Sequence, residues 1–402
     1  MILRYLLLIL LIVAPLAQGA IVVNEFRAFS FMPVDNFDAT DQEEPLRPEL
    51  VLWGKHRRSP LSWHYELNTG MAEGSAPTHW ALRQAYAGLD RHPLQLALGR
   101  RLVSWETFEF YSPIKYMVPF NLQRQAIDTN EQKAGVDFAG SYAQITDRLD
   151  LSYLYLPYIE PTRFPDSFLD PLRQVPSLQS VEYPSRERDS QSLLRLRYRT
   201  LSVTGAIIGF HGHDTIPVFR PGDHQWRSDL PEKKLIGGQF SMEAAGMIWK
   251  TELAYSDIEA DCGRRPVCGS DVIQNGLLGV ESQLPDDGYL ILEGWYRKKQ
   301  YQARDDALIL LDSSFRNQRE NEQSVLFAEY QKNAMNNQLK IRIAGGSAIT
   351  SSGWFSRLKL QYSHNQHFTM SAKVTLNQGS NDSFFGFLEY SNGIGLQLSY
   401  FL

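Results

Sequence analysis

The sequence has few cysteines and, after its first twenty residues, no uninterrupted apolar run long enough to span a membrane as a helix. Only two cysteines occur among 402 residues, which excludes a disulfide-rich scaffold. Acidic and basic residues nearly balance, and the net charge of −5 gives no reason to expect nucleic-acid binding. The lack of apolar runs argues against spanning helices. It does not argue against membrane strands, in which lipid-facing and lumen-facing residues alternate and average out.

A short apolar stretch follows a positive charge at the start of the chain. Arg4 precedes an apolar run, Tyr5–Pro15, and small residues follow it. This order indicates a secretory signal peptide over residues 1–19, with cleavage after Gly19 or, alternatively, after Ala20. An N-terminal membrane anchor is the competing interpretation, but the run is shorter than the ~20 residues that a spanning helix needs.

Period two, the strand period, dominates the remaining sequence. Between Phe368 and Leu376 the apolar residues fall on one face and the polar residues on the other. The same alternation recurs within 148–155, 236–243, 249–255 and 339–343. Most of these strands have a charged face opposite the apolar one, which suits a wet lumen better than the core of a soluble sandwich. The sequence predicts an all-β fold, a transmembrane antiparallel β-barrel of about 16–18 strands.

Tight turns and longer polar stretches separate these strands. Pro285–Gly288 and Asn365–Gln366 are typical of short periplasmic turns, and longer loops are expected outside. Pro157–Ser192 is the candidate for a loop that narrows the lumen, and 111–131 is another irregular stretch. We assign the barrel to residues 56–402, and the less strand-like residues 20–55 to an N-terminal periplasmic arm or plug segment.

Both cysteines, Cys262 and Cys268, lie in one turn-rich segment. In an exported protein this spacing predicts a small loop disulfide. A metal site would need two further ligands, and the neighbouring sequence offers none. We therefore predict neither a metal nor a cofactor.

The last predicted strand runs to the final residue and alternates in hydrophobicity. Such a strand, with an aromatic residue near its end, resembles the signal that the outer-membrane assembly machinery reads. Leu398, Tyr400, Phe401 and Leu402 would carry this signal, although the chain ends in leucine with the phenylalanine one position early. The alternative is the terminal strand of a soluble β domain. The signal predicts location in the cell outer membrane of a Gram-negative bacterium, among lipid and lipopolysaccharide.

Several short motifs lie in the first half of the chain. They are Arg83-Gln84-Ala85-Tyr86, the stretches Leu96–Trp105, Pro119–Asn121 and Leu154–Pro161, and, further on, Gly209–Pro217. Together they resemble a group of poorly characterised proteobacterial outer-membrane barrels. In that group a Gly-Arg-Gln turn is usually followed by Val-x-Trp-Gly, whereas here Arg101 replaces the glutamine and Glu106 the glycine. The resemblance implies a porin-like barrel, sometimes discussed with export of lipids or hydrophobic compounds, and implies no catalytic residue.

Three arginines alternate with apolar residues near the middle of the chain. Arg195, Arg197 and Arg199 share one face, which is the lumen face if the segment is a barrel strand. Such a row raises the local concentration of anions, so one interpretation is a selectivity ladder. The other interpretation is that its charges are neutralised by Asp150, Glu243, Glu252 or Glu281. The same reasoning gives further pore-lining candidates: Arg83, Lys250, Glu252, Lys340, Arg342 and Lys373.

Aromatic residues are abundant, and several fall at expected strand ends. We expect them to form girdles at the two membrane interfaces. They are Trp105, Tyr111, Tyr155, Tyr158, Trp249, Tyr255, Trp295, Trp354 and Tyr390.

Catalytic groups are not evident. A phospholipase-type site needs His and Ser two positions apart on one strand face, but Gln366 follows His364 at that spacing. His211 and His213 share a face near Asp214, in a position typical of a loop mouth. We predict no enzymatic activity.

The predicted function is an outer-membrane channel or porin-like transporter for small or amphiphilic solutes, with anion preference as its sharper form. The alternative is a non-conducting structural or accessory barrel of an export or assembly machine. The expected partners are the solute, the surrounding lipid, the barrel-assembly machinery and, as in many porins, further copies of the chain.

Overall fold

The computed structural model describes most of the chain. The described residues are 21–33, 47–58, 60–70, 79–114, 117–121, 133–163, 180–181, 189–221, 225–260, 269–285, 287–303, 322–379, 385 and 392–401.

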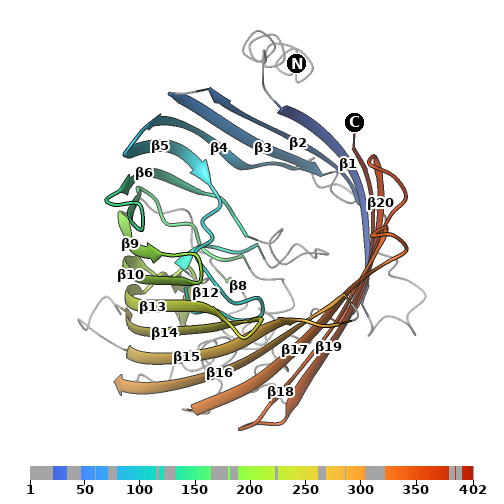
Figure 1. Ribbon diagram of the computed structural model, residues 1–402. Helices are drawn as coiled ribbons and strands as arrows, with labels where there is room; N and C mark the ends of the chain where they lie inside the picture. Colours follow the sequence, from blue (N-terminus) through green and yellow to red (C-terminus); the bar gives the residue numbers. More distant parts are fainter. Residues whose placement is uncertain are drawn as a thin grey trace.

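In the described part of the chain, eighteen antiparallel strands form one sheet (Figure 1). β1 (Ile21–Pro33) pairs with β2 (Arg47–Arg58) on one side and with β21 (Gly393–Phe401) on the other, so the cycle of pairings returns to its first strand. The intervening strands pair in chain order, which makes the sheet a β-barrel and confirms the predicted fold and strand number. They are β3 (Leu61–Gly70), β4 (His79–Arg91), β5 (Leu94–Arg101), β6 (Val136–Gln144), β7 (Leu149–Leu156), β9 (Gln191–Arg199), β10 (Val203–His213), β13 (Glu232–Ala244), β14 (Met247–Ala260), β15 (Gly269–Gln283), β16 (Gly288–Ala303), β17 (Glu322–Ala334), β18 (Leu339–Ala348), β19 (Gly353–Ser363) and β20 (Phe368–Gly379).

A second, small sheet is formed by segments between the barrel strands. It contains β8 (Ser180–Val181), β11 (Val218–Pro221) and β12 (Gln225–Asp229). β11 and β12 form an antiparallel pair within the connection from β10 to β13, and β8 pairs with β12 in parallel.

The barrel wall has an apolar outer face and a polar inner face. On β14 the outward residues Trp249, Leu253 and Tyr255 are exposed, whereas the inward Glu252 and Ser256 are buried. Exposed apolar residues at alternate positions continue around the barrel, with Leu278 70% exposed and Leu326 56% exposed. This alternation confirms the period-two interpretation, because residues of one parity face hydrocarbon and residues of the other face the lumen.

The two ends of the barrel differ in their connections. At one end all links are short, from the two residues 245–246 to the four residues 364–367. At the other end lie the long connections 102–135, 157–190 and 214–231. Ala245 and Gly246 have φ values of 55° and 73°, the left-handed conformation that a two-residue hairpin turn requires at both positions. One rim therefore carries short links alone, as the sequence predicts for a periplasmic side, whereas the other carries the long connections together with the short link 349–352.

The proposed N-terminal arm or plug is wrong in the part that the structure describes. Residues 20–55 contain β1 and most of β2, which belong to the barrel wall. The reason is visible in the sequence of β1, where the alternation changes phase: Phe26 and Ala28 have one parity, Phe29 and Phe31 the other. No single face is apolar, so the periodicity that identifies the other strands is lost.

Four further predictions lie wholly or partly outside the described residues. The proposed signal peptide, both cysteines and most of Pro157–Ser192 are among them, and so is Leu402. In the part of the chain that is described, no helix is both long enough and apolar enough to cross a membrane.

Candidate functional site

A stretch of chain between β5 and β6 lies inside the barrel. We call residues 102–121 the lumen segment, of which 102–114 and 117–121 are described. In Figure 1 it runs from the end of β5 across the interior. It contacts inward-facing residues of strands from β6 to β19, with its polar contacts on β13–β16, so it narrows the lumen on that side.

A buried carboxylate on β14 binds the middle of the lumen segment. Glu252 is fully buried and accepts hydrogen bonds from Ser112 Oγ at 2.5 Å and from Thr107 Oγ1 at 3.2 Å. Gln239 on β13 donates to the same carboxylate at 2.9 Å and to the backbone oxygen of Trp105 at 2.7 Å. Each polar group is satisfied by a partner across the interface, as burial requires. The segment therefore has a defined position on β13 and β14.

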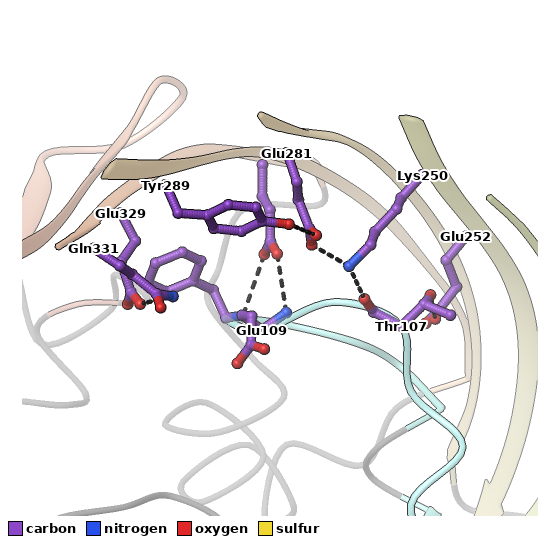
Figure 2. A network of polar contacts seen from close by, with 10 residues as sticks. Thr107, Glu109, Lys250, Glu252, Glu281, Tyr289, Glu329 and Gln331 are labelled. Carbon is purple, nitrogen blue, oxygen red and sulfur yellow. Dashed lines mark hydrogen bonds and ion pairs between the residues drawn. The ribbon is translucent and has the colours of Figure 1, made fainter. Parts of the chain in front are cut away.

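A second carboxylate binds the backbone of the segment. Glu293 on β16 accepts the N–H of Glu109 at 2.9 Å through one oxygen and the N–H of Phe110 at 3.2 Å through the other (Figure 2). Between these two carboxylates, Lys250 donates to the backbone oxygen of Thr107 at 3.1 Å and forms an ion pair with Glu281. Hydrogen bonds with one charged partner are stronger than neutral ones. Wall residues of β13–β16 thus hold residues 105–112 at several points.

Aromatic packing adds to these polar contacts. Phe110 stacks on Phe327 of β17, with ring centroids 4.9 Å apart and planes inclined by 5°. Phe355 of β19 meets Phe110 edge-on at 5.8 Å, and Tyr111 lies 4.0 Å from Trp295 of β16. These rings belong to one buried cluster on the inner wall. Inward-facing apolar residues are stable there because the lumen segment covers them.

The first part of the segment packs on the opposite flank. Val103 and Trp105 join a second buried cluster with wall residues that include Phe138, Leu193 and Phe210. The Trp105 ring lies under the guanidinium group of Arg195, 4.7 Å from its centre. The segment therefore reaches from the arginine row of β9 to the aromatic cluster of β15–β19.

All three arginines of the predicted ladder face the lumen. On β9 their neighbours Leu194, Leu196 and Tyr198 are exposed on the outer face. Arg197 pairs with Asp150 at 3.0 Å, and Arg199 approaches the same carboxylate at 3.4 Å. Arg195 makes no ion pair among the described residues, and its buried Nε has no hydrogen-bond partner there. Asp150 therefore neutralises part of the row, as one interpretation expects, and the selectivity ladder stays a prediction.

The candidates on β18–β20 form another basic group. Arg342, Lys359 and Lys373 occupy directly paired positions on three adjacent strands. Arg342 lies 4.0 Å from the buried Glu329, which also pairs with Arg357 at 2.7 Å. Lys340 shares the inward parity of Arg342 and is exposed near the short-turn rim. The structure thus brings three predicted candidates, Lys340, Arg342 and Lys373, to one side of the lumen.

The remaining candidates stabilise the wall and the segment. Arg83 forms an ion pair with Glu66 of β3, and Lys250 and Glu252 hold the lumen segment as described above. Glu252 has no ion pair among the described residues, so it neutralises none of the arginines that it was considered to pair with.

His211 and His213 lie at the long-loop rim, whereas His364 lies in the short link between β19 and β20. His211 is 3.8 Å from Glu232, and His213 is 3.5 Å from Asp189. In the described parts of the chain no group of His, Cys, Asp and Glu is arranged to hold a metal ion.

Three of the residues expected in the aromatic girdles lie inside the barrel instead. Trp105 and Tyr111 belong to the lumen segment, and Trp295 is buried with its indole N–H donating to Asn275 at 3.2 Å. Tyr155, Trp249, Tyr255 and Trp354 do lie exposed on the outer face. Neither the abundance of aromatic residues nor their position near a strand end distinguishes the inward from the outward ones. Within a strand, alternate positions face opposite sides of the sheet, and this decides which face an aromatic side chain occupies.

The lumen segment and its main contacts were not predicted from the sequence; these are Thr107, Glu109, Phe110, Ser112 and Glu293. One signal was available. Leu277, Trp295, Val325 and Phe327 are apolar at inward positions, on strands whose outward positions are apolar as well. Strands that are apolar on both faces are covered on both faces. Such a stretch predicts that another part of the chain lies against the inner wall.

These features define the class: the chain is a transmembrane β-barrel of the outer-membrane type, with an internal segment that narrows its lumen. No family profile matches the sequence, and no curated protein matches it. Solved structures do match the fold. OpdK of Pseudomonas aeruginosa, solved with vanillate, has a TM-score of 0.56 at 10% identity, over 96% of this chain and 99% of its own.

Two further solved structures have a similar fold. OccD3 (OpdP) of Pseudomonas aeruginosa gives a TM-score of 0.55 at 12% identity, covering 96% of this chain and 91% of its own. OccAB3 of Acinetobacter baumannii gives 0.54 at 10% identity, covering 95% and 99%. At these identities the likeness concerns the fold, and the match over nearly the full length of each chain supports a single barrel.

Proposed function

We propose that the protein is a channel in the outer membrane that passes small solutes and prefers anions. The observation that carries the proposal is a difference in exposure between the charges of the inner wall. The side chains of Arg199 and Arg342 are 48% and 42% exposed, whereas those of Asp150 and Glu329 are 2% and 3% exposed. A solute in the lumen therefore meets bases more directly than acids.

Simple electrostatics gives this difference its effect. Exposed charges that line a narrow aqueous passage raise the local concentration of counterions. The negative charge of Asp150 is shared by Arg197 and Arg199, so the arginine row keeps a positive excess. Arg195 adds a guanidinium group without an ion pair among the described residues. Passive diffusion through such a lumen needs no covalent chemistry.

Planar-bilayer recordings test the proposal. In a KCl gradient we expect discrete conductance steps and a reversal potential on the chloride side. The triple variant Arg195→Gln, Arg197→Gln, Arg199→Gln should move that potential towards the cation side, because three lumen charges are lost.

Lys234→Gln is the matched control, since Lys234 is exposed on the outer face of β13. It should leave the reversal potential unchanged. Conductance without anion preference would overturn the selectivity part of the proposal. Absence of conductance from correctly folded protein would favour the non-conducting accessory role.

A further inference from the structure

Glu109 differs from the carboxylates of the wall. It is exposed, and it makes no ion pair among the described residues, whereas Glu281 and Glu329 are buried and paired. Figure 2 shows its carboxylate pointing away from the strands that carry Glu281 and Tyr289, towards the barrel interior. The lumen segment thus presents a negative charge to the passage that it narrows.

The position of this charge is fixed by its neighbours. Phe108 is 3% exposed and lies against the inward-facing Gly279, where an added Cβ would be 2.8 Å from its ring. Phe110 stacks on Phe327. Phe108 and Phe110 thus both contact the wall, and the side chain of Glu109 between them is exposed. Glu293 holds the backbone N–H groups of both Glu109 and Phe110, which keeps this arrangement in place.

The charge opposes the preference that the exposed arginines create. A simple anion is attracted by the bases and repelled by Glu109 at the constriction. A solute that carries an ammonium group beside its carboxylate can place one charge near each wall. Glu109 therefore affects specificity. Its charge raises the energy of a simple anion in the constriction and lowers the energy of a solute that carries an ammonium group.

We infer that Glu109 is a specificity-determining residue of the constriction, positioned by Glu293, and that it favours dipolar solutes with adjacent cationic and anionic groups over simple anions. This inference rests on the proposed channel function and names the solute class that the same passage selects.

Fluxes of alanine and lactate from proteoliposomes at pH 7 test the inference. The two solutes have nearly the same size, and an ammonium group in one replaces a hydroxyl group in the other. We expect Glu109→Gln to lower the ratio of alanine flux to lactate flux by up to about fivefold, the factor for two unit charges about 4 Å apart in water. The neutral variant should fold, because the side chain that changes is exposed.

Glu243→Gln is the matched control. Glu243 is an exposed carboxylate at the short-turn end of β13, away from the lumen segment, so its loss should leave the flux ratio unchanged. Glu293→Ala keeps the charge of Glu109 but removes the hydrogen bonds that position it, and it should give an intermediate ratio.

The possible failures are distinct. If the unchanged protein passes neither solute, the channel proposal fails. If both solutes pass and Glu109→Gln leaves their ratio unchanged, or changes it no more than Glu243→Gln does, the channel remains and the role of Glu109 is refuted.

Discussion

The inner wall of this barrel has a covered region on β13–β17 and an open region on β18–β20. The two regions differ in how far their charged side chains are buried. On β13–β17 the lumen segment covers the wall, where Glu252 and Glu293 are buried and bind hydroxyl, amide and backbone donors. On β18–β20 Arg342 is half exposed in a basic row with Lys359 and Lys373. Inward charges therefore hold an internal segment in one region and line the lumen in the other.

Loss of both carboxylates should have the largest effect on the covered region. In the double variant Glu252→Ala, Glu293→Ala, the donors from Ser112, Glu109 and Phe110 lose their acceptors. Each buried unsatisfied group costs about 1–3 kcal/mol. Amide hydrogen exchange of residues 105–112, measured by mass spectrometry, should become faster by about 30-fold or more. Glu243→Ala is the control, and equal exchange in both variants would show that the carboxylates do not hold the segment.

Filling the space under Phe108 should have a somewhat smaller effect. In Gly279→Val the new Cβ would lie 2.8 Å from the Phe108 ring and 3.3 Å from the Leu292 oxygen, so the segment must shift. Overpacking of this kind costs about 1–3 kcal/mol, and exchange of residues 105–112 should rise accordingly. Gly276→Val faces outward with Leu253 at 3.6 Å and should leave that exchange unchanged. A similar rise in the exchange rate in both variants would contradict the close approach of Phe108 to Gly279.

Removal of one stacked ring should have a smaller effect again. Phe110→Leu keeps an apolar side chain but loses the stacking on Phe327, and an aromatic pair contributes about 0.5–1.5 kcal/mol beyond its buried area. Exchange of residues 105–112 should become about two- to tenfold faster. The control is Phe240→Leu on the outer face, where Phe240 is 41% exposed. An unchanged rate in Phe110→Leu would mean that hydrogen bonds alone hold the segment.

Changes in the open region should leave the segment in place. The double variant Arg342→Gln, Lys373→Gln removes two lumen charges on β18 and β20, outside the strands whose polar side chains bind residues 105–112, so exchange there should stay the same. The bilayer reversal potential should still move towards the cation side, by less than in the β9 triple variant, because fewer charges are lost. Faster exchange of residues 105–112 in this variant would show that the covered and open regions are coupled, and it would contradict the distinction drawn here between them.

Much of the wall was predictable from the sequence, and the segment inside it was not. Lipid on one side and water on the other impose period two, so the outward Trp249, Leu253 and Tyr255 and the inward arginines of β9 follow from parity alone. The lumen segment depends on contacts between distant residues, with 145 positions between Thr107 and Glu252 and 184 between Glu109 and Glu293. No local pattern encodes such pairings. β1 was not identified as a barrel strand for a different reason: its alternation of apolar and polar residues changes phase.

The pairing of β1 with β21 has a consequence for how the molecule forms. Nine residue pairs, from Glu25 with Phe401 to Pro33 with Gly393, join the first strand of the sheet to the last. Until β1 pairs with β21, one edge of β1 stays unpaired. This lasts while the rest of the chain is synthesised and delivered. An exposed edge invites wrong partners, so the risk of mispairing lasts until the two ends of the sheet meet.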